Sequence, residues 1–191
     1  VLANLGVQPG DRVILVSPNR YEWIVCDLAI QFARAVHVPV HASLSGPQIA
    51  WQIRDSGAGV VILSSSEQAE KLSPHSREFD EDTRVLSFDA CPEPWEHCYF
   101  RRMADVVTTL SRGAIDCAIQ EGLEEVGPNN LATILYTSGT TGEPKGVMLS
   151  QNNLASNAIA AANCFHQQPG DLRLTWLPFS HIFARTCDIY T

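Results

Sequence analysis

Short apolar runs alternate with amphipathic segments along the first ninety residues of the chain. Four runs have the length and the almost unbroken apolar character of buried β-strands: Val13–Ser17, Val36–Val40, Val60–Leu63 and Val85–Phe88. Pro39 lies within the second run. A proline there is expected either in an edge strand or near the end of a strand. Alternation of such strands with helices predicts an α/β fold with a mostly parallel sheet and helices on both faces.

Helix signals follow the first two apolar runs. Asn19 and Glu22 have the spacing of a capping box, and Ile24, Leu28 and Phe32 then recur every four residues, so we expect them to form the apolar face.

The second helix has clearer boundaries. Ser45-Gly-Pro-Gln48 is a helix start with proline in the first turn, Ile49 and Ile53 form an apolar stripe, and Gly57 is a helix end. A third, short helix is expected near Glu67–Leu72.

The pattern is less regular in the second half. Between Asp89 and Tyr99 two prolines and the absence of a period predict a loop, followed by a helix around Arg101–Ser111. Three further strands are expected at Leu131–Tyr136, Gly146–Leu149 and Leu172–Leu177. Ser150 begins a helix between the last two, and its apolar side is expected to contain Leu154, Ala158, Ala162 and Phe165.

The composition is that of a globular domain, with 45% hydrophobic and 18% charged residues among 191. A chain of this length can bury one sizeable core. The formal net charge is −8, and the basic pair Arg101-Arg102 is too short to form a patch. Because non-specific nucleic-acid binding needs clustered basic side chains, the charge argues against a nucleic-acid partner.

Six cysteines are scattered without a C-x-x-C pair or a zinc-type spacing. We interpret them as reduced thiols of a cytoplasmic protein, with a Cys91–Cys98 disulfide as the weaker alternative. We expect neither a signal peptide nor a membrane span, since no apolar run approaches the ~20 residues that cross a bilayer. The chain starts without Met and stops within a predicted helix, so we expect it to be a fragment.

The most informative stretch lies between two predicted strands and reads Thr137-Ser-Gly-Thr-Thr-Gly-Glu-Pro-Lys-Gly146. Glycines permit positive φ and let backbone N–H groups approach an anion closely, as in the concave nests that bind phosphate. Hydroxyl groups add neutral donors, and Lys145, one of two lysines in the chain, adds a positive charge. The stretch therefore predicts a phosphate-binding loop.

Three better-known loop types fit these residues less well. A Walker A loop requires Gly-Lys-Ser/Thr at the start of a helix, whereas here Pro144 precedes Lys145 and Gly146 follows it. The G-x-G-x-x-G spacing of a dinucleotide-binding loop is also missing. A plain hairpin turn favours the same residue types, but it does not require ten such positions in succession.

The segment Tyr136–Val147 resembles, position for position, the signature loop of the adenylate-forming superfamily of acyl-CoA synthetases, peptide-synthetase activation domains and luciferases. Leu177-Pro-Phe-Ser-His-Ile-Phe-Ala-Arg185 is similar to the next motif, in the form typical of long-chain fatty acid CoA ligases. Gly6–Trp23 is also similar to the superfamily's amino-terminal region. Three positions depart from the pattern and bear on the subfamily and substrate: Arg34 (Gly expected), His41 (aromatic expected) and Gln151 (often His).

This resemblance implies an incomplete part of the large amino-terminal domain of the adenylate-forming fold. Residues 1–191 would be a single partial AMP-binding domain, truncated at both ends and lacking the carboxyl-terminal domain with the catalytic lysine. The implied reaction is activation of a long-chain fatty acid by ATP and Mg²⁺ to an acyl-adenylate, followed by transfer to coenzyme A. The fragment alone is expected to be inactive.

The resemblance also implies roles for individual residues. Six would embrace the β- and γ-phosphates of ATP: Thr137, Ser138, Gly139, Thr140, Thr141 and Gly142. Thr140 or Thr141 would stabilise the departing pyrophosphate, Thr141 would lie beside Mg²⁺, and Lys145 would be a loop cation rather than the catalytic lysine.

His181 would lie at the start of a helix beside the acyl pocket and help to place the substrate carboxylate, with Ser180 as N-cap. The alternative is a histidine that satisfies a local backbone group. Arg185 is expected to be a structural ion-pair residue. The other histidines are interpreted as structural or surface residues: His37, His41, His75, His97 and His166.

Several alternatives stay open at this point. The protein could be a ligase for another carboxylic acid, a domain that loads a carrier protein, or a non-catalytic nucleotide-binding module. Its partners are expected to be small molecules, and the sequence does not specify an oligomeric state. A long-chain substrate would make peripheral membrane contact reasonable, although no amphipathic basic helix is visible.

Overall fold

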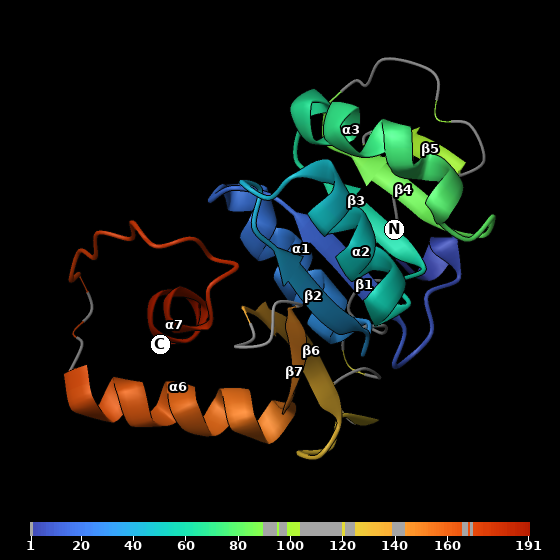
Figure 1. Cartoon of the computed structure of the whole chain (residues 1–191). Coiled ribbons are helices and arrows are strands. Elements are labelled where there is room, and N and C mark those ends of the chain that lie inside the picture. Colours follow the sequence, from blue (N-terminus) through green and yellow to red (C-terminus); the bar gives the residue numbers. More distant parts are fainter. Residues whose placement is uncertain are drawn as a thin grey trace.

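The computed structural model describes residues 2–89, 95, 99–103, 120, 125–138, 144–165, 168 and 170–191. Among these residues seven strands form one sheet in the order β5-β4-β3-β1-β2-β6-β7, and only β6 and β7 pair antiparallel (Figure 1). The strands are β1 (Arg12–Val16), β2 (Val36–Val40), β3 (Val60–Leu63), β4 (Arg84–Ser87), β5 (Tyr99–Arg102), β6 (Leu131–Thr137) and β7 (Lys145–Ser150). The predicted α/β fold with a mostly parallel sheet is confirmed.

Five α-helices and three shorter helical turns are described. The α-helices are α1 (Tyr21–Phe32), α2 (Gly46–Ser56), α3 (Ser66–Leu72), α6 (Gln151–Phe165) and α7 (Ile182–Ala184). The 3₁₀ turns are η1 (Ala3–Leu5) and η2 (Ser73–Glu78), and α7 continues into a π-helical turn, η3 (Arg185–Ile189).

Helices cover both faces of the sheet because successive connections run in opposite directions. From β1 the chain steps to β2 on one side, and from β2 it returns past β1 to β3 on the other. Right-handed crossovers then require α1 and α2 to lie on opposite faces. Side chains alternate along each strand, so Ile14 and Val16 pack with α2 and α3, whereas Val13 and Leu15 pack with α1.

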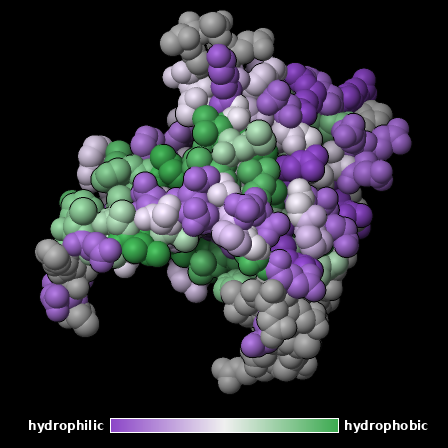
Figure 2. Space-filling view, turned by 90° about the horizontal axis from the view of Figure 1, so that it is seen from below, coloured by the Kyte–Doolittle hydropathy of each residue, from purple (hydrophilic) through white to green (hydrophobic). Residues whose placement is uncertain are grey.

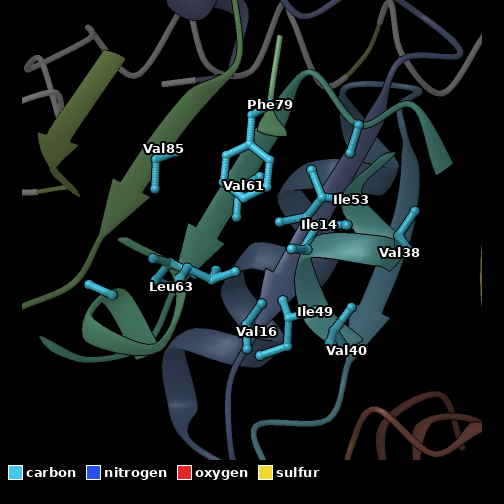
Figure 3. Close-up of a cluster of buried hydrophobic side chains, with 14 residues drawn as sticks. Ile14, Val16, Val38, Val40, Ile49, Ile53, Val61, Leu63, Phe79 and Val85 are labelled. Carbon is cyan, nitrogen blue, oxygen red and sulfur yellow. The ribbon is translucent and has the colours of Figure 1, made fainter. Parts of the chain in front are cut away.

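The core on the α2 side is built almost entirely from aliphatic side chains. Figure 3 shows Ile49 and Ile53 of α2 reaching toward residues of β1 to β4, with Phe79 at one end of the cluster. Ile49 is fully buried and Ile53 nearly so, which confirms the predicted stripe of this helix. The helix begins with the predicted capping box and ends at Gly57, whose φ of 62° is left-handed.

The apolar face predicted for α1, with Ile24, Leu28 and Phe32, is not the face that packs on the sheet. Trp23 and Ile30 are fully buried, whereas Leu28 and Phe32 are 42% and 37% exposed. Apolar residues occur on both sides of this helix, and their spacing alone cannot tell which side meets the sheet. In the structure the side that contains the large indole of Trp23 packs inward.

Pro39 lies next to the end of β2, as one part of its prediction allowed, but β2 is an interior strand. In the register with β6, His37 pairs with Thr133. His37 comes two residues before Pro39. The backbone nitrogen that cannot donate therefore lies beyond the ladder position shared with β6.

Two predicted elements differ from the structure. Arg101 and Arg102, where the predicted helix 101–111 would start, belong to strand β5, which pairs with β4 at the sheet edge. Residues 104–111 of that predicted helix lie outside the described residues. The segment 172–177 is not a strand, although its apolar residues alternate. A strand needs a hydrogen-bonding partner, and no described strand pairs with this segment.

Helix α6 begins at the predicted position, where the backbone N–H of Asn153 donates to Ser150 Oγ at 3.3 Å. Leu154 and Ala158 are buried as expected, but Ala162 and Phe165 are exposed. Hydrophobic residues gather at the surface on the side of the molecule that carries α6 and β7 (Figure 2). No helix among the described residues combines the length and the apolar character needed to cross a membrane.

Candidate active site

The predicted phosphate loop connects β6 to β7, which pair so that Thr137 lies opposite Lys145. Thr137, Ser138 and Lys145 are exposed. Just beyond the loop, a Cβ on Gly146 would approach Ile134 Cγ2 within 2.9 Å, so the close packing of the two strands requires glycine there. Five loop residues, 139–143, lie outside the described residues. The contact of Gly139, Thr140, Thr141 and Gly142 with phosphate therefore stays a prediction.

A pocket of about 290 Å³ lies where β2 and β6 end. These strands are parallel, so their carboxyl ends meet at the edge where open α/β sheets bind ligands. The pocket brings Thr137, the last residue of β6, together with His181, which precedes α7. Its wall consists of Pro39, His41, Gln52, Leu135, Tyr136, Thr137, Val147, Leu149, Ser180, His181 and Ile182.

His41 directly follows β2 and lines the pocket, whereas a structural or surface residue was expected there. Its Nδ1 lies 2.7 Å from Oγ of Ser180, whose side chain is 5% exposed. Burial lowers the pKa of His41, and the nearby His181 lowers it further, so the ring is neutral at pH 7. Only its position after a strand that ends at the ligand-binding edge could have indicated this place.

His181, rather than Ser180, caps α7. Its Nδ1 accepts a hydrogen bond from the backbone N–H of Phe183 at 3.2 Å. The prediction that Ser180 is the N-cap is wrong because its hydroxyl pairs with His41 instead. The local backbone bond considered for His181 therefore exists, while the ring also faces the pocket.

Asn19 holds the segment that leads to His181, and this is why it does not cap α1. Its Nδ2 donates to the carbonyl of Leu177 at 2.8 Å, and its Oδ1 accepts from the N–H of Phe179 at 2.7 Å. Helix α1 starts after Arg20, which makes no side-chain cap. Asn19, which was predicted to cap α1, therefore fixes the position of the second motif, residues 177–185.

Arg185 lies below the pocket and is completely buried. Its Nη2 donates to Asp27 Oδ1 at 2.5 Å, and its Nη1 donates to Thr133 Oγ1 at 2.8 Å. The Tyr190 hydroxyl donates to Asp27 Oδ2 at 2.6 Å. The predicted ion-pair role of Arg185 is confirmed, and the network joins α1, β6 and the segment that carries His181.

Asp27 is ionised and His37 is neutral in this network. Burial opposes the negative charge of Asp27, but Arg185 and His37 outweigh it and hold the pKa of the carboxyl below its usual value. Burial lowers the pKa of His37 more than Asp27 raises it. The neutral ring therefore donates its Nδ1–H to Asp27 Oδ1 at 2.6 Å, and its buried Nε2 has no partner among the described residues.

Tyr136 fixes the end of β6 from which the loop departs. Its hydroxyl donates to Asp55 Oδ2 at 2.6 Å, and its ring meets Trp51 edge-on at 5.7 Å. Burial and the Asp55 carboxylate raise the pKa of Tyr136 above its usual value, so the hydroxyl keeps its proton. Helix α2 thereby anchors the strand end next to Thr137.

The polar donors of the described pocket suit an anion rather than a divalent cation. They are hydroxyl, imidazole and carboxamide groups, whereas Mg²⁺ prefers carboxylate and phosphate oxygens. Within the described part of the chain, no group of three His, Cys, Asp or Glu residues is placed to hold a metal ion. The assignment of Thr141 to Mg²⁺ concerns a residue outside that part.

The mostly parallel sheet matches the large amino-terminal domain of the adenylate-forming enzymes, and the signature loop lies beside a pocket at its carboxyl edge. Residues 1–191 match the family of AMP-binding enzymes, and the chain belongs to that family. It is similar to the inhibitor-bound N-terminal domain of FACL13 from Mycobacterium tuberculosis, with a TM-score of 0.71 and 27% identity, covering 99% of this chain and 43% of that one.

Two curated relatives show which ligases of this family the chain resembles. The chain is 34% identical over 187 residues to the long-chain-fatty-acid–CoA ligase FadD15 of Mycobacterium bovis, covering 96% of this chain and 30% of that protein. It is 31% identical over 188 residues to fatty acyl-CoA synthetase A of Dictyostelium discoideum, covering 96% and 27%. The chain thus spans less than a third of these relatives, which are acid–thiol ligases.

Proposed function

We propose that this chain is the substrate-binding part of an acid–thiol ligase that activates long-chain fatty acids. A carboxylate oxygen attacks the α-phosphorus of ATP, the bond to the pyrophosphate group breaks, and an acyl-adenylate forms. The sulfur of coenzyme A then attacks the acyl carbonyl carbon, AMP leaves, and the thiol proton is released. Such chemistry depends mainly on positioning and on neutralising phosphate charge.

The observation that carries this proposal is the pocket at the carboxyl ends of β2 and β6. It joins the start of the signature loop, at Thr137, to the second motif, at His181, although 44 positions separate them in the numbering. Aliphatic side chains make up much of its wall, which suits the first methylene groups of an acyl chain. The 34% identity to a long-chain-fatty-acid–CoA ligase supports the same substrate class.

In this proposal the loop residues bind the β- and γ-phosphates through backbone N–H and hydroxyl groups, and Lys145 adds positive charge at the loop's end. Thr140 or Thr141 stabilises the leaving pyrophosphate. His181 faces the substrate carboxylate through the pocket. The described donors do not suit Mg²⁺, so the ion would rely on the phosphates of ATP, and Thr141 is the residue of this chain that would lie beside it.

We also propose that residues 1–191 form part of a single AMP-binding domain and that the catalytic lysine belongs to a further domain. The match of the family over 1–191 and the partial coverage of the relatives support this division. Accordingly, residues 1–191 produced alone should form no acyl-adenylate. Detection of this product with the isolated chain would contradict the division.

The test is release of pyrophosphate by the complete protein with ATP, Mg²⁺ and a panel of fatty acids. We expect release with long acyl chains, and its collapse in a Thr140→Ala/Thr141→Ala double variant. Release only with short or aromatic acids would keep the reaction and refute the substrate class. ATP binding without release for any acid would favour a non-catalytic nucleotide-binding module.

A further inference from the structure

The wall of the pocket contains a second histidine, His41, which the signature motifs do not include. It follows β2 and lies beside His181, which comes from a segment 140 positions later. We propose that His41 is a binding residue of this site and donates a hydrogen bond from Nε2 to the carboxylate of the acyl substrate. This inference rests on the proposed function, because it places that carboxylate in the pocket.

The contact with Ser180 is compatible with the tautomer of His41 that this proposal requires. Nδ1 lies 2.7 Å from Ser180 Oγ, and a hydroxyl can donate its hydrogen to an unprotonated ring nitrogen. When Ser180 donates to Nδ1, the neutral ring of His41 carries its hydrogen on Nε2. That nitrogen makes no hydrogen bond to a described residue and is available to a ligand.

The side chains around His41 indicate which anion it meets. The pocket residues around His41 are the neutral polar side chains of Thr137 and Gln52 and the imidazole of His181, together with Leu135 and Ile182 of the apolar wall. The Tyr136 hydroxyl already donates its hydrogen to Asp55. The Lys71 ammonium donates at 3.1 Å to the carbonyl of Ala42, the residue that follows His41.

An apolar wall with a few polar donors suits a carboxylate on an alkyl chain better than a chain of phosphates, which would favour a more cationic lining. A phenylalanine at this position would fill a similar space without donating a hydrogen bond. Histidine at position 41 therefore adds a specific contact for the carboxylate.

The experiment uses the complete protein and compares His41→Phe with His41→Gln. Phenylalanine keeps the aromatic volume and removes the donor, whereas the amide N–H of glutamine lies near the position of the imidazole Nε2–H. His75→Gln is the matched control, since His75 lies outside the pocket and pairs with Glu78. The readouts are KM for dodecanoate and KM for ATP in the pyrophosphate-release assay.

We expect His41→Phe to raise KM for dodecanoate about tenfold or more, as the loss of a hydrogen bond to a charged group would. KM for ATP should stay unchanged, His41→Gln should restore most of the affinity, and His75→Gln should behave as the wild type. Equal KM values for His41→Phe and wild type, or equal losses in the Phe and Gln variants, would overturn the proposal. A rise only in KM for ATP would overturn the assignment to the carboxylate.

Failure of the proposed function would be seen separately, as absence of pyrophosphate release by the wild type with every acid. In that case calorimetric titration of dodecanoate into the same variants decides the role of His41. About tenfold weaker binding by His41→Phe than by His41→Gln supports the contact, and equal binding refutes it.

Discussion

Removing one partner of the buried ion pair between Asp27 and Arg185 should destabilise this domain strongly. Both side chains are completely buried, and the pair joins α1 to the segment that carries His181. Replacing Asp27 with asparagine keeps the shape but leaves the guanidinium without its counter-charge. Breaking a buried pair in this way costs about 3–5 kcal/mol. The bonds from Arg185 to Thr133 and Tyr190 stay in place, so we expect the lower end of that range.

The assay is urea unfolding of the complete protein, followed by tryptophan fluorescence. The Trp23 ring lies 6.0 Å from the Arg185 guanidinium carbon, so its emission reports on this region. With an m-value of about 2–3 kcal/mol per molar urea, a loss of about 3 kcal/mol moves the midpoint by roughly 1–1.5 M. The control is Glu67→Gln, which breaks an exposed pair with Lys71 and should leave the midpoint almost unchanged.

A double variant separates the ion pair from the shape of the site. Asp27→Asn/Arg185→Met removes both charges, so it should lose less stability than the sum of the two single variants. The reasoning would be refuted if Asp27→Asn shifted the midpoint no more than Glu67→Gln does, or if the two single losses simply added.

Three further changes test the account of the fold. Arg34 is the only described non-glycine residue with positive φ, at 59°, a conformation that strains an L side chain. Arg34→Gly should therefore raise the melting temperature, although it removes the ion pair with Glu125. A lower melting temperature would contradict the strain at this position. His37 has a lowered pKa in the folded state, so the unfolded chain takes up the proton first as the pH falls below about 6.5, and stability should decrease from there. That decrease should be weaker in His37→Asn, and an identical urea-midpoint profile would exclude His37 as its source. Ser45→Ala removes the capping bond shared with Gln48 and should cost about 1 kcal/mol in the same urea assay, whereas no loss would show that this cap is dispensable.

The sequence was sufficient for elements whose signals are local. The capping box at Ser45 and the glycine at position 57 define α2 at both ends, and the apolar runs define the central strands. Where a signal is local but ambiguous, the prediction was wrong. Leu28 and Phe32 have helical spacing, yet the opposite face of α1 packs on the sheet, because the large buried side chains of Trp23 and Ile30 lie there.

The described site depends on contacts that sequence spacing does not reveal. Asn19 bonds to Leu177 and Phe179, and Asp27 bonds to Arg185, across separations of 158 to 160 residues. Arg185 was expected to form an ion pair, and an acidic residue on an otherwise apolar helix face was the only sign of its partner. The signature motifs identified the family without these contacts, but they did not reveal how the two motifs are held together.

The central claim is tested most directly by identifying the product formed when coenzyme A is left out. The complete protein is incubated with palmitate, ATP and Mg²⁺, and the products are analysed by mass spectrometry before and after coenzyme A is added. We predict palmitoyl-adenylate and pyrophosphate in the first sample, and palmitoyl-CoA and AMP in the second. Conversion of ATP to ADP and phosphate, or no palmitate-dependent product despite ATP binding, would contradict the proposed reaction.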